Sequence, residues 1–208
     1  RHHFSIQEDD WQAMFAESWF PFIGLGTERV RSMLTQIRCK RPIDDLLPSW
    51  DSHLKTVSAK LRGLVDTNAQ LAAHRGVLCR ALQHFESGDA LSCTQMLYPR
   101  LEGVLRDWHV LNSPTSRATQ KSLADTAAID RHNSRHELSL LMPQRFAIYL
   151  STVFFRNFEP GTVDHISRNT VAHGVAPESL MSPRAAAIGI LTLDQLVYLM
   201  APSEASIS

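Results

Sequence analysis

The run from Arg168 to Gly174, Arg-Asn-Thr-Val-Ala-His-Gly, places a guanidinium, an amide and an imidazole within six residues. A guanidinium stays positively charged at any ordinary pH, whereas an imidazole exchanges a proton near neutrality. Together these groups can hold a phosphate and move protons without a metal ion. We therefore take Arg168, Asn169 and His173 as the candidate catalytic residues of a site that cleaves phosphodiesters.

The reaction that suits these groups is metal-independent cleavage of RNA. The ribose 2′-hydroxyl attacks the adjacent phosphate and must lose a proton, while the leaving 5′-oxygen must gain one. His173 can serve either transfer, and the forked guanidinium of Arg168 can stabilise the charge that builds on the phosphate oxygens. Asn169 would orient the phosphate or the imidazole. No cofactor and no metal ion are expected.

The geometry of a helix limits how these three side chains can meet. Residues five apart on an ideal helix point about 140° away from each other, so Arg168 and His173 do not share a face, whereas Asn169 and His173 do. Either the long Arg168 side chain reaches around the helix, or the helix ends within the motif. Gly174 can end it, and a position at the helix C-terminus favours the protonated form of His173.

A second helix, expected over residues 97–111, is the candidate for the opposite wall of the site. An apolar stripe runs along it beside a polar stripe made of Tyr98, Glu102, Arg106 and His109, which we take as candidate cleft-lining residues. Glu102 and Arg106 are four apart. They form either a surface ion pair worth a few tenths of a kcal/mol or part of the cleft, with Glu102 orienting Arg106 or a base.

These features together resemble the HEPN superfamily of helical ribonucleases, over roughly residues 75–200. That family is marked by an Arg and a His a few residues apart, the Arg often followed by a polar residue, which Arg168, Asn169 and His173 match. The stretch Tyr-Pro-Arg-Leu-Glu-Gly-Val-Leu-Arg, residues 98–106, is similar to the Pro-x-x-Glu-x-x-x-Arg helix of some bacterial HEPN-like families. The resemblance implies an endoribonuclease that acts on RNA, as a toxin or defence effector.

The resemblance also implies partners. Members of the family pair as homodimers in which two motifs face one cleft, so that two Arg and two His share the reaction. A toxin would further imply a protein antitoxin or another regulatory partner. The expected HEPN-like bundle occupies residues 49–208, and residues 1–48 would form an extra helical appendage.

Other interpretations stay open at this stage. A second Arg-x4-His pair, Arg131 and His136, shows that this spacing arises freely, although it lacks the Asn, the inward-packing Val171-Ala172 and the closing glycine of the first pair. The motif could belong to a non-catalytic HEPN-like module that binds a nucleotide or a protein. It could also be an ordinary helix end in a structural dimerisation domain. His132 and His136 are interpreted as loop residues.

Composition places further bounds on function. The 208 residues carry 21 basic and 21 acidic side chains, so the formal net charge is zero. Tight non-specific binding of nucleic acid by an overall basic surface is thereby excluded, and a local basic cleft is what remains. The three cysteines show neither disulfide nor metal spacing, which is typical of a cytoplasmic protein. No apolar run is long enough to predict a membrane span.

The chain predicts an all-α helical bundle. Apolar residues recur at helical spacing nearly throughout, with no βαβ alternation, no phosphate-binding glycine loop and no internal repeat. Pro42 and Pro48 predict a break between residues 1–48 and 49–208. A helix over 54–85 is expected to be interrupted near 63–68, residues 112–137 to form a long connection, and residues 138–158 to form the buried central helix. Pro99 is expected to kink or restart its helix.

Overall fold

The computed structural model describes residues 6–129 and 142–201 of the chain. All regular structure in those two ranges is helical, and neither contains a strand, which confirms the predicted all-α bundle. None of the helices in these ranges combines the length and the apolar character needed to cross a bilayer.

The first half of the chain forms four helices joined by short 3₁₀ turns. In chain order these are α1 (Glu8–Ala16), η1 (Ile23–Leu25), α2 (Gly26–Arg38), η2 (Ile43–Leu46), α3 (Leu47–Thr67), η3 (Ala69–Leu71) and α4 (Arg75–Glu86). The interruption expected near residues 63–68 comes later, because α3 continues to Thr67 and the turn to α4 occupies residues 68–74.

The second half begins with the longest helix of the described chain. Its elements are α5 (Ala90–Asn112), α6 (Gln120–Thr126), α7 (Pro143–Tyr149), the π-helix η4 (Leu150–Phe154), α8 (Arg168–Ala172), η5 (Glu178–Leu180) and α9 (Pro183–Met200). Asp89 caps α5 by accepting a hydrogen bond from the Ser92 amide at 3.0 Å. The helix continues through Pro99, so the expected restart does not occur.

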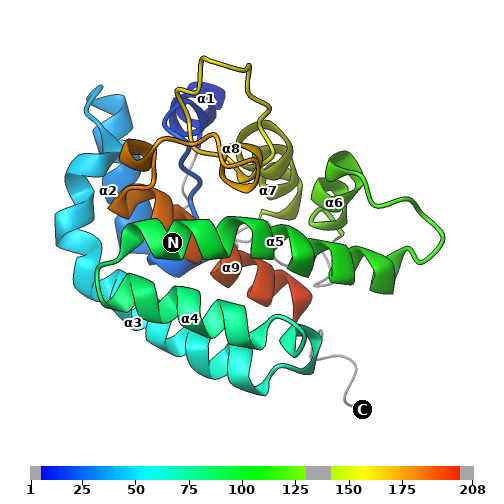
Figure 1. The fold of residues 1–208 in the computed structure, drawn as a ribbon. Coiled ribbons are helices and arrows are strands. Elements are labelled where there is room, and N and C mark those ends of the chain that lie inside the picture. The colour runs from blue at the N-terminus through cyan, green and yellow to red at the C-terminus, as the bar shows by residue number, and fades with distance from the viewer. Residues whose placement is uncertain (1–5, 130–141, 202–208) are drawn as a thin grey trace, which may run out of the picture.

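Helix α9 is the central helix of the bundle. Ser182 caps it and Pro183 occupies its first position, and the residues that follow are mostly apolar and almost all buried. Helices α3, α4 and α5 pack around it, with α5 crossing in front of it in Figure 1. The sequence prediction gave this central role to residues 138–158, which was wrong. Residues 138–141 lie outside the described residues, and in the described remainder a short α-helix passes directly into a π-helix.

Aromatic residues before α2 belong to the same core as the later helices. Trp19, Phe20 and Phe22 are fully buried. The ring centroid of Phe20 lies 5.3 Å from that of Phe146 and 5.4 Å from that of Tyr149, both on α7. Residues 1–48, expected as an appendage, thus supply part of the interior as far as the structure describes them, and α3 runs across the expected boundary.

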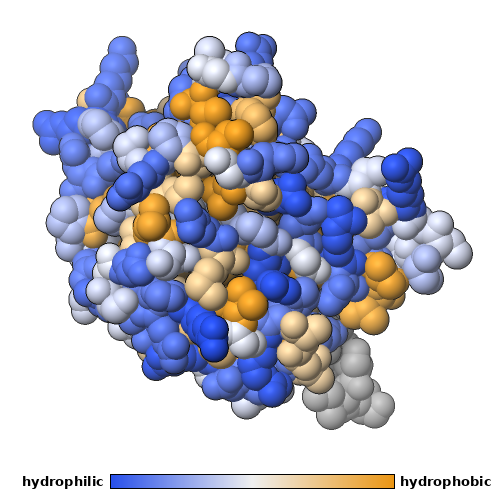
Figure 2. Space-filling view, viewed as in Figure 1, coloured by the Kyte–Doolittle hydropathy of each residue, from blue (hydrophilic) through white to orange (hydrophobic). Residues whose placement is uncertain are grey.

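The surface in the view of Figure 2 is mainly hydrophilic, with small apolar clusters. One cluster lies at the end of α5, where Val110 and Leu111 expose 55% and 64% of their surfaces. Scattered apolar residues of this kind are normal on a folded protein.

Candidate functional site

Helix α8 is short because its sequence caps it at both ends. At the start, the Ser167 hydroxyl accepts a hydrogen bond from the Thr170 amide at 3.2 Å, and the Thr170 hydroxyl accepts one from the Ser167 amide at 2.9 Å. At the other end, His173 is the C-cap and Gly174 has φ of +67°, a conformation that favours glycine. The helix therefore ends within the motif. This is one of the two arrangements that would allow the Arg168 and His173 side chains to approach each other.

Glu102 is the centre of the candidate site. It is only 4% exposed, yet its carboxylate meets two guanidinium groups. Oε1 accepts hydrogen bonds from Nε and Nη2 of Arg106 at 3.0 and 2.6 Å, while Oε2 forms an ion pair with Nε of Arg168. The two arginines compensate the charge of this carboxylate, because an unpaired buried charge is strongly unfavourable. The cluster joins α5 to α8 and carries one net positive charge.

Asn169 is buried, and its amide is fully used within the protein. Its Oδ1 accepts hydrogen bonds from Nε2 of Gln120 at 2.6 Å and from Nη1 of Arg168 at 3.1 Å. Its Nδ2 donates to the carbonyl oxygen of Phe155 at 2.9 Å and to Oδ1 of Asn157 at 3.0 Å. We had expected Asn169 to orient a phosphate or the imidazole. In this arrangement it orients Arg168.

Sequence reasoning missed Gln120, the first residue of α6. Its amide pairs with that of Asn169 in both directions, the second hydrogen bond running from Asn169 Nδ2 to Gln120 Oε1 at 3.3 Å. Nearby, Nη1 of Arg106 donates to the carbonyl oxygen of Ala118 at 3.2 Å. The segment that leads into α6 therefore contacts Arg106 directly and contacts Arg168 through Asn169. No spacing rule marks Gln120, because it lies 49 residues from Asn169 in the sequence.

His173 lies at the opposite end of α8 from Arg168 and is exposed. Its ring packs against Phe158, with centroids 5.6 Å apart and an angle of 58° between the planes. Among the described residues, its ring nitrogens have no hydrogen-bond partner, and it makes no recorded contact with the arginine cluster. Of the two residues expected to pack inward beside it, Val171 is buried and Ala172 is exposed.

The remaining two candidate cleft-lining residues belong to the packed interior. Tyr98 stacks on Phe154 at a centroid distance of 5.6 Å and donates its hydroxyl hydrogen bond to the Ala185 carbonyl at 3.0 Å. Burial raises the pKa of the Tyr98 phenol well above its usual value. His109 is 3% exposed, with Nδ1 lying 2.8 Å from Oγ1 of Thr126. Only Glu102 and Arg106 of the predicted polar stripe therefore reach the site.

Metal ligands do not gather at this site. The two described ranges contain no group of three or more His, Cys, Asp or Glu side chains arranged to hold an ion. His132, His136 and Arg131, and with them the second Arg-x4-His pair, lie outside the described residues.

No family model matches this chain, and neither a curated protein nor a solved structure is similar to it. What the site can do chemically follows from its own side chains: two cations fixed around one buried carboxylate, and an exposed imidazole one short helix away. Such a pair of cations can bind an anion, and the imidazole can exchange a proton with it.

Proposed function

We propose that the protein is a metal-independent endoribonuclease of HEPN type, with Arg168 and His173 as its reacting side chains. The observation that carries the proposal is the Glu102 carboxylate, which fixes Arg168 beside Arg106 while His173 stays exposed at the end of the same short helix. Positively charged groups held in place before the reaction stabilise developing negative charge better than groups that must first be ordered.

In the proposed reaction, the ribose 2′-oxygen forms a bond to phosphorus and the bond from phosphorus to the 5′-oxygen breaks. The products are a 2′,3′-cyclic phosphate and a free 5′-hydroxyl. His173 donates its proton to the leaving 5′-oxygen, and in a homodimer the partner subunit's His173 takes the proton from the 2′-hydroxyl. This pairing supplies an acid and a base from one motif per chain.

Arg106 is expected to contact the phosphate first. Its side chain is 47% exposed, compared with 21% for Arg168, so the residue from α5 is the more accessible of the two cations. Arg168, the more buried of the two, would then add positive charge near the phosphate, while Glu102 keeps both guanidinium groups in place. A single-stranded RNA is the substrate class that can bring its backbone against so small a group of cations. A toxin or defence effector with a protein antitoxin is the biological setting we propose.

A second function is favoured by a specific observation. The side-chain amide of Asn169 forms all its hydrogen bonds within the protein, and the Glu102 carboxylate neutralises the charge of one of the two arginines. A cluster satisfied in this way also suits a non-catalytic helical module that binds a nucleotide or a protein partner through Arg106.

Cleavage of RNA by a His173→Ala variant separates these two functions. We expect the wild-type protein to cut a fluorescent single-stranded RNA in the presence of EDTA, leaving cyclic phosphate ends, and the variant to lose that activity while its circular dichroism and melting curve stay unchanged. His84→Ala is the control for the loss of an imidazole: His84 is 39% exposed on α4 and lies 3.0 Å from Asp89 at the start of α5, so its loss should leave cleavage intact. Full cleavage by the His173 variant, or an inactive wild-type protein, would favour the binding module.

A further inference from the structure

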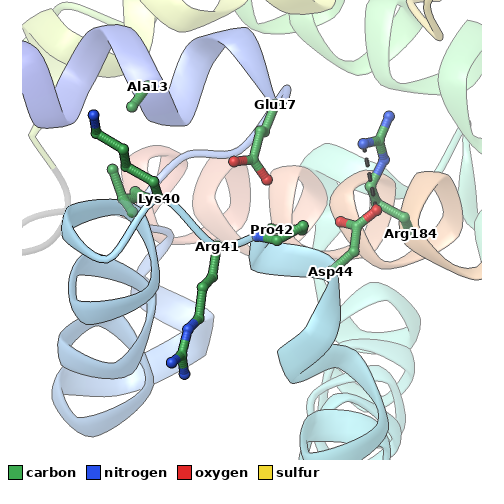
Figure 3. Close-up of a pocket in the computed structure, with 8 residues that line it drawn as sticks. Ala13, Glu17, Lys40, Arg41, Pro42, Asp44 and Arg184 are labelled. Atoms are coloured by element: carbon green, nitrogen blue, oxygen red, sulfur yellow. Dashed lines mark hydrogen bonds and ion pairs between the residues drawn. The ribbon is translucent and has the colours of Figure 1, made fainter.

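A groove on another part of the surface brings together charged residues from four elements. It lies where the ends of α1 and α2, the turn η2 and the start of α9 meet, and it has a volume of about 500 Å³ (Figure 3). That volume falls within the range of small-molecule sites. No residue of this groove belongs to the Glu102 cluster.

Lys40 stands at a position that the backbone disfavours. It follows the C-terminus of α2 with φ of +54°, in the left-handed region where glycine is the usual residue. A side chain in that region costs about 1 kcal/mol. Among the described residues Lys40 has no ion pair. The amides of Lys40 and Arg41 donate hydrogen bonds to the carbonyl oxygens of Ile37 and Gln36 at 2.8 and 2.9 Å, so this conformation closes the end of α2.

Glu17 stands at a position that local electrostatics disfavours. It is the C-cap of α1, so its carboxylate lies at the end of the helix that carries partial negative charge. One oxygen, Oε2, accepts a hydrogen bond from the Ile43 amide at 2.9 Å, and the carboxylate has no cationic partner within the described ranges. Figure 3 shows this carboxylate inside the groove, with Lys40 to one side of it.

The far end of the groove is already neutralised. Arg184, in the first turn of α9, pairs with Oδ2 of Asp44 at 3.4 Å, while Oδ1 of Asp44 accepts a hydrogen bond from Nε1 of Trp19 at 3.1 Å. Arg41 points away from the groove (Figure 3). Among the described residues, Lys40 and Glu17 therefore remain as a cation and an anion of the groove that have no ionic partner.

We infer that this groove binds a free α-amino acid, with its carboxylate on Lys40 and its ammonium group on Glu17. A groove that offers one unpaired charge of each sign favours a zwitterion over a simple anion, because an anion would be repelled by Glu17. The lining also includes Ile37 and Pro42, whose apolar atoms suit an aliphatic side chain. Two locally unfavourable positions facing one hollow are what a site retained for binding would show.

Leucine and two analogues test the assignment in isothermal titration of the full chain. 4-Methylpentanoate lacks the ammonium group of leucine, and 3-methylbutylamine lacks its carboxylate. We expect leucine to bind at least tenfold more tightly than either analogue, because each analogue leaves one charged group unpaired. Equal binding of leucine and one analogue, or no binding of leucine at millimolar concentration, would overturn the inference.

Matched variants assign the two contacts. Lys40→Gln should weaken leucine and 4-methylpentanoate but leave 3-methylbutylamine unchanged, and Glu17→Gln should weaken leucine and the amine but spare the carboxylate. Arg41→Gln removes the same charge as Lys40→Gln from the adjacent residue and should change leucine binding less than twofold. If Lys40→Gln and Arg41→Gln have the same effect, the general charge of the surface is responsible and the site does not exist. Melting curves of all variants check that each is folded.

Discussion

Glu102 on α5 and Arg168 on α8, which lie 66 residues apart in the chain, form an ion pair between the two helices, and Arg106 binds the other oxygen of the same carboxylate. The three side chains hold α8 on α5. Any anion that binds the arginines meets groups already fixed in position, because Glu102 is buried.

Replacing Glu102 by Ala should destabilise the protein strongly, since it leaves two guanidinium groups facing each other without their carboxylate. Breaking a buried pair typically costs about 3–5 kcal/mol in the free energy of unfolding. Urea denaturation followed by circular dichroism measures the change. Asp51→Ala is the control, because Asp51 and Lys55 form the same i, i+4 pair on α3 with side chains 58% and 46% exposed. A loss below about 1 kcal/mol for both variants would show that the Glu102 cluster contributes no more to the free energy of unfolding than a surface ion pair.

Replacing Gln120 by Ala should reduce RNA cleavage without unfolding the protein. The variant removes the amide that pairs with Asn169, so Arg168 loses part of its support while keeping Glu102. We expect the turnover number to fall by about tenfold, on the scale of one hydrogen bond to a charged network. Gln70→Ala, at an exposed position of η3, should have no effect. If the two variants cleave equally well, α6 does not position the arginine.

Asp194 should make stability depend on pH. Burial raises the pKa of its carboxyl from 3.8 to about 6, and Lys60 offsets only part of that shift. Because the folded-state pKa lies above the unfolded-state value, the contribution of Asp194 is fully present below about pH 4 and is lost as the pH rises through 6. Asp194→Asn should raise the free energy of unfolding at pH 7.5, by up to roughly 3 kcal/mol, and flatten the pH profile. Urea titrations at pH 4 and 7.5 test this, and a variant less stable at pH 7.5 would contradict it.

Two helical glycines should respond in opposite directions to substitution by Ala. In Gly189→Ala the new Cβ would lie 2.9 Å from Cδ2 of Leu97, so the contact between α9 and α5 must open at a cost of about 1–3 kcal/mol. In Gly63→Ala, on α3, the Cβ meets nothing within 4 Å and should stabilise the helix by about 0.5–1 kcal/mol. Thermal melts of both variants give the signs. Equal shifts would mean that α9 and α5 are not in close contact at Gly189.

Local signals in the sequence predicted local structure well. The turn between α3 and α4 and the end of α8 at Gly174 each follow from a few neighbouring residues, and the structure contains both. The central helix was assigned to the wrong segment because two late segments are almost equally apolar. Which of them lies at the centre depends on how α3, α4 and α5 pack, and periodicity within one segment does not contain that information.

Long-range relationships explain what was missed at the site. Tyr98 and His109 follow the polar stripe of α5 by spacing, yet both are buried, and the Tyr98 hydroxyl and the Nδ1 atom of His109 bond to α9 and α6. The pair of Gln120 and Asn169 depends on two segments meeting in space. The ion pair of Glu102 with Arg106 was predicted as one of two alternatives. The burial of Glu102 was not predicted, because it depends on the packing of α8 against α5.

The rings of Phe20 and Phe22 against α7 carry a consequence for how this chain could be shortened or recombined. A fragment starting at residue 49 would retain Phe146 and Tyr149 but lose the aromatic neighbours that shield them from water. Such a fragment would be prone to aggregate through the apolar surface that it exposes. A gene fusion that carries only the later helices would likewise lack part of the hydrophobic core.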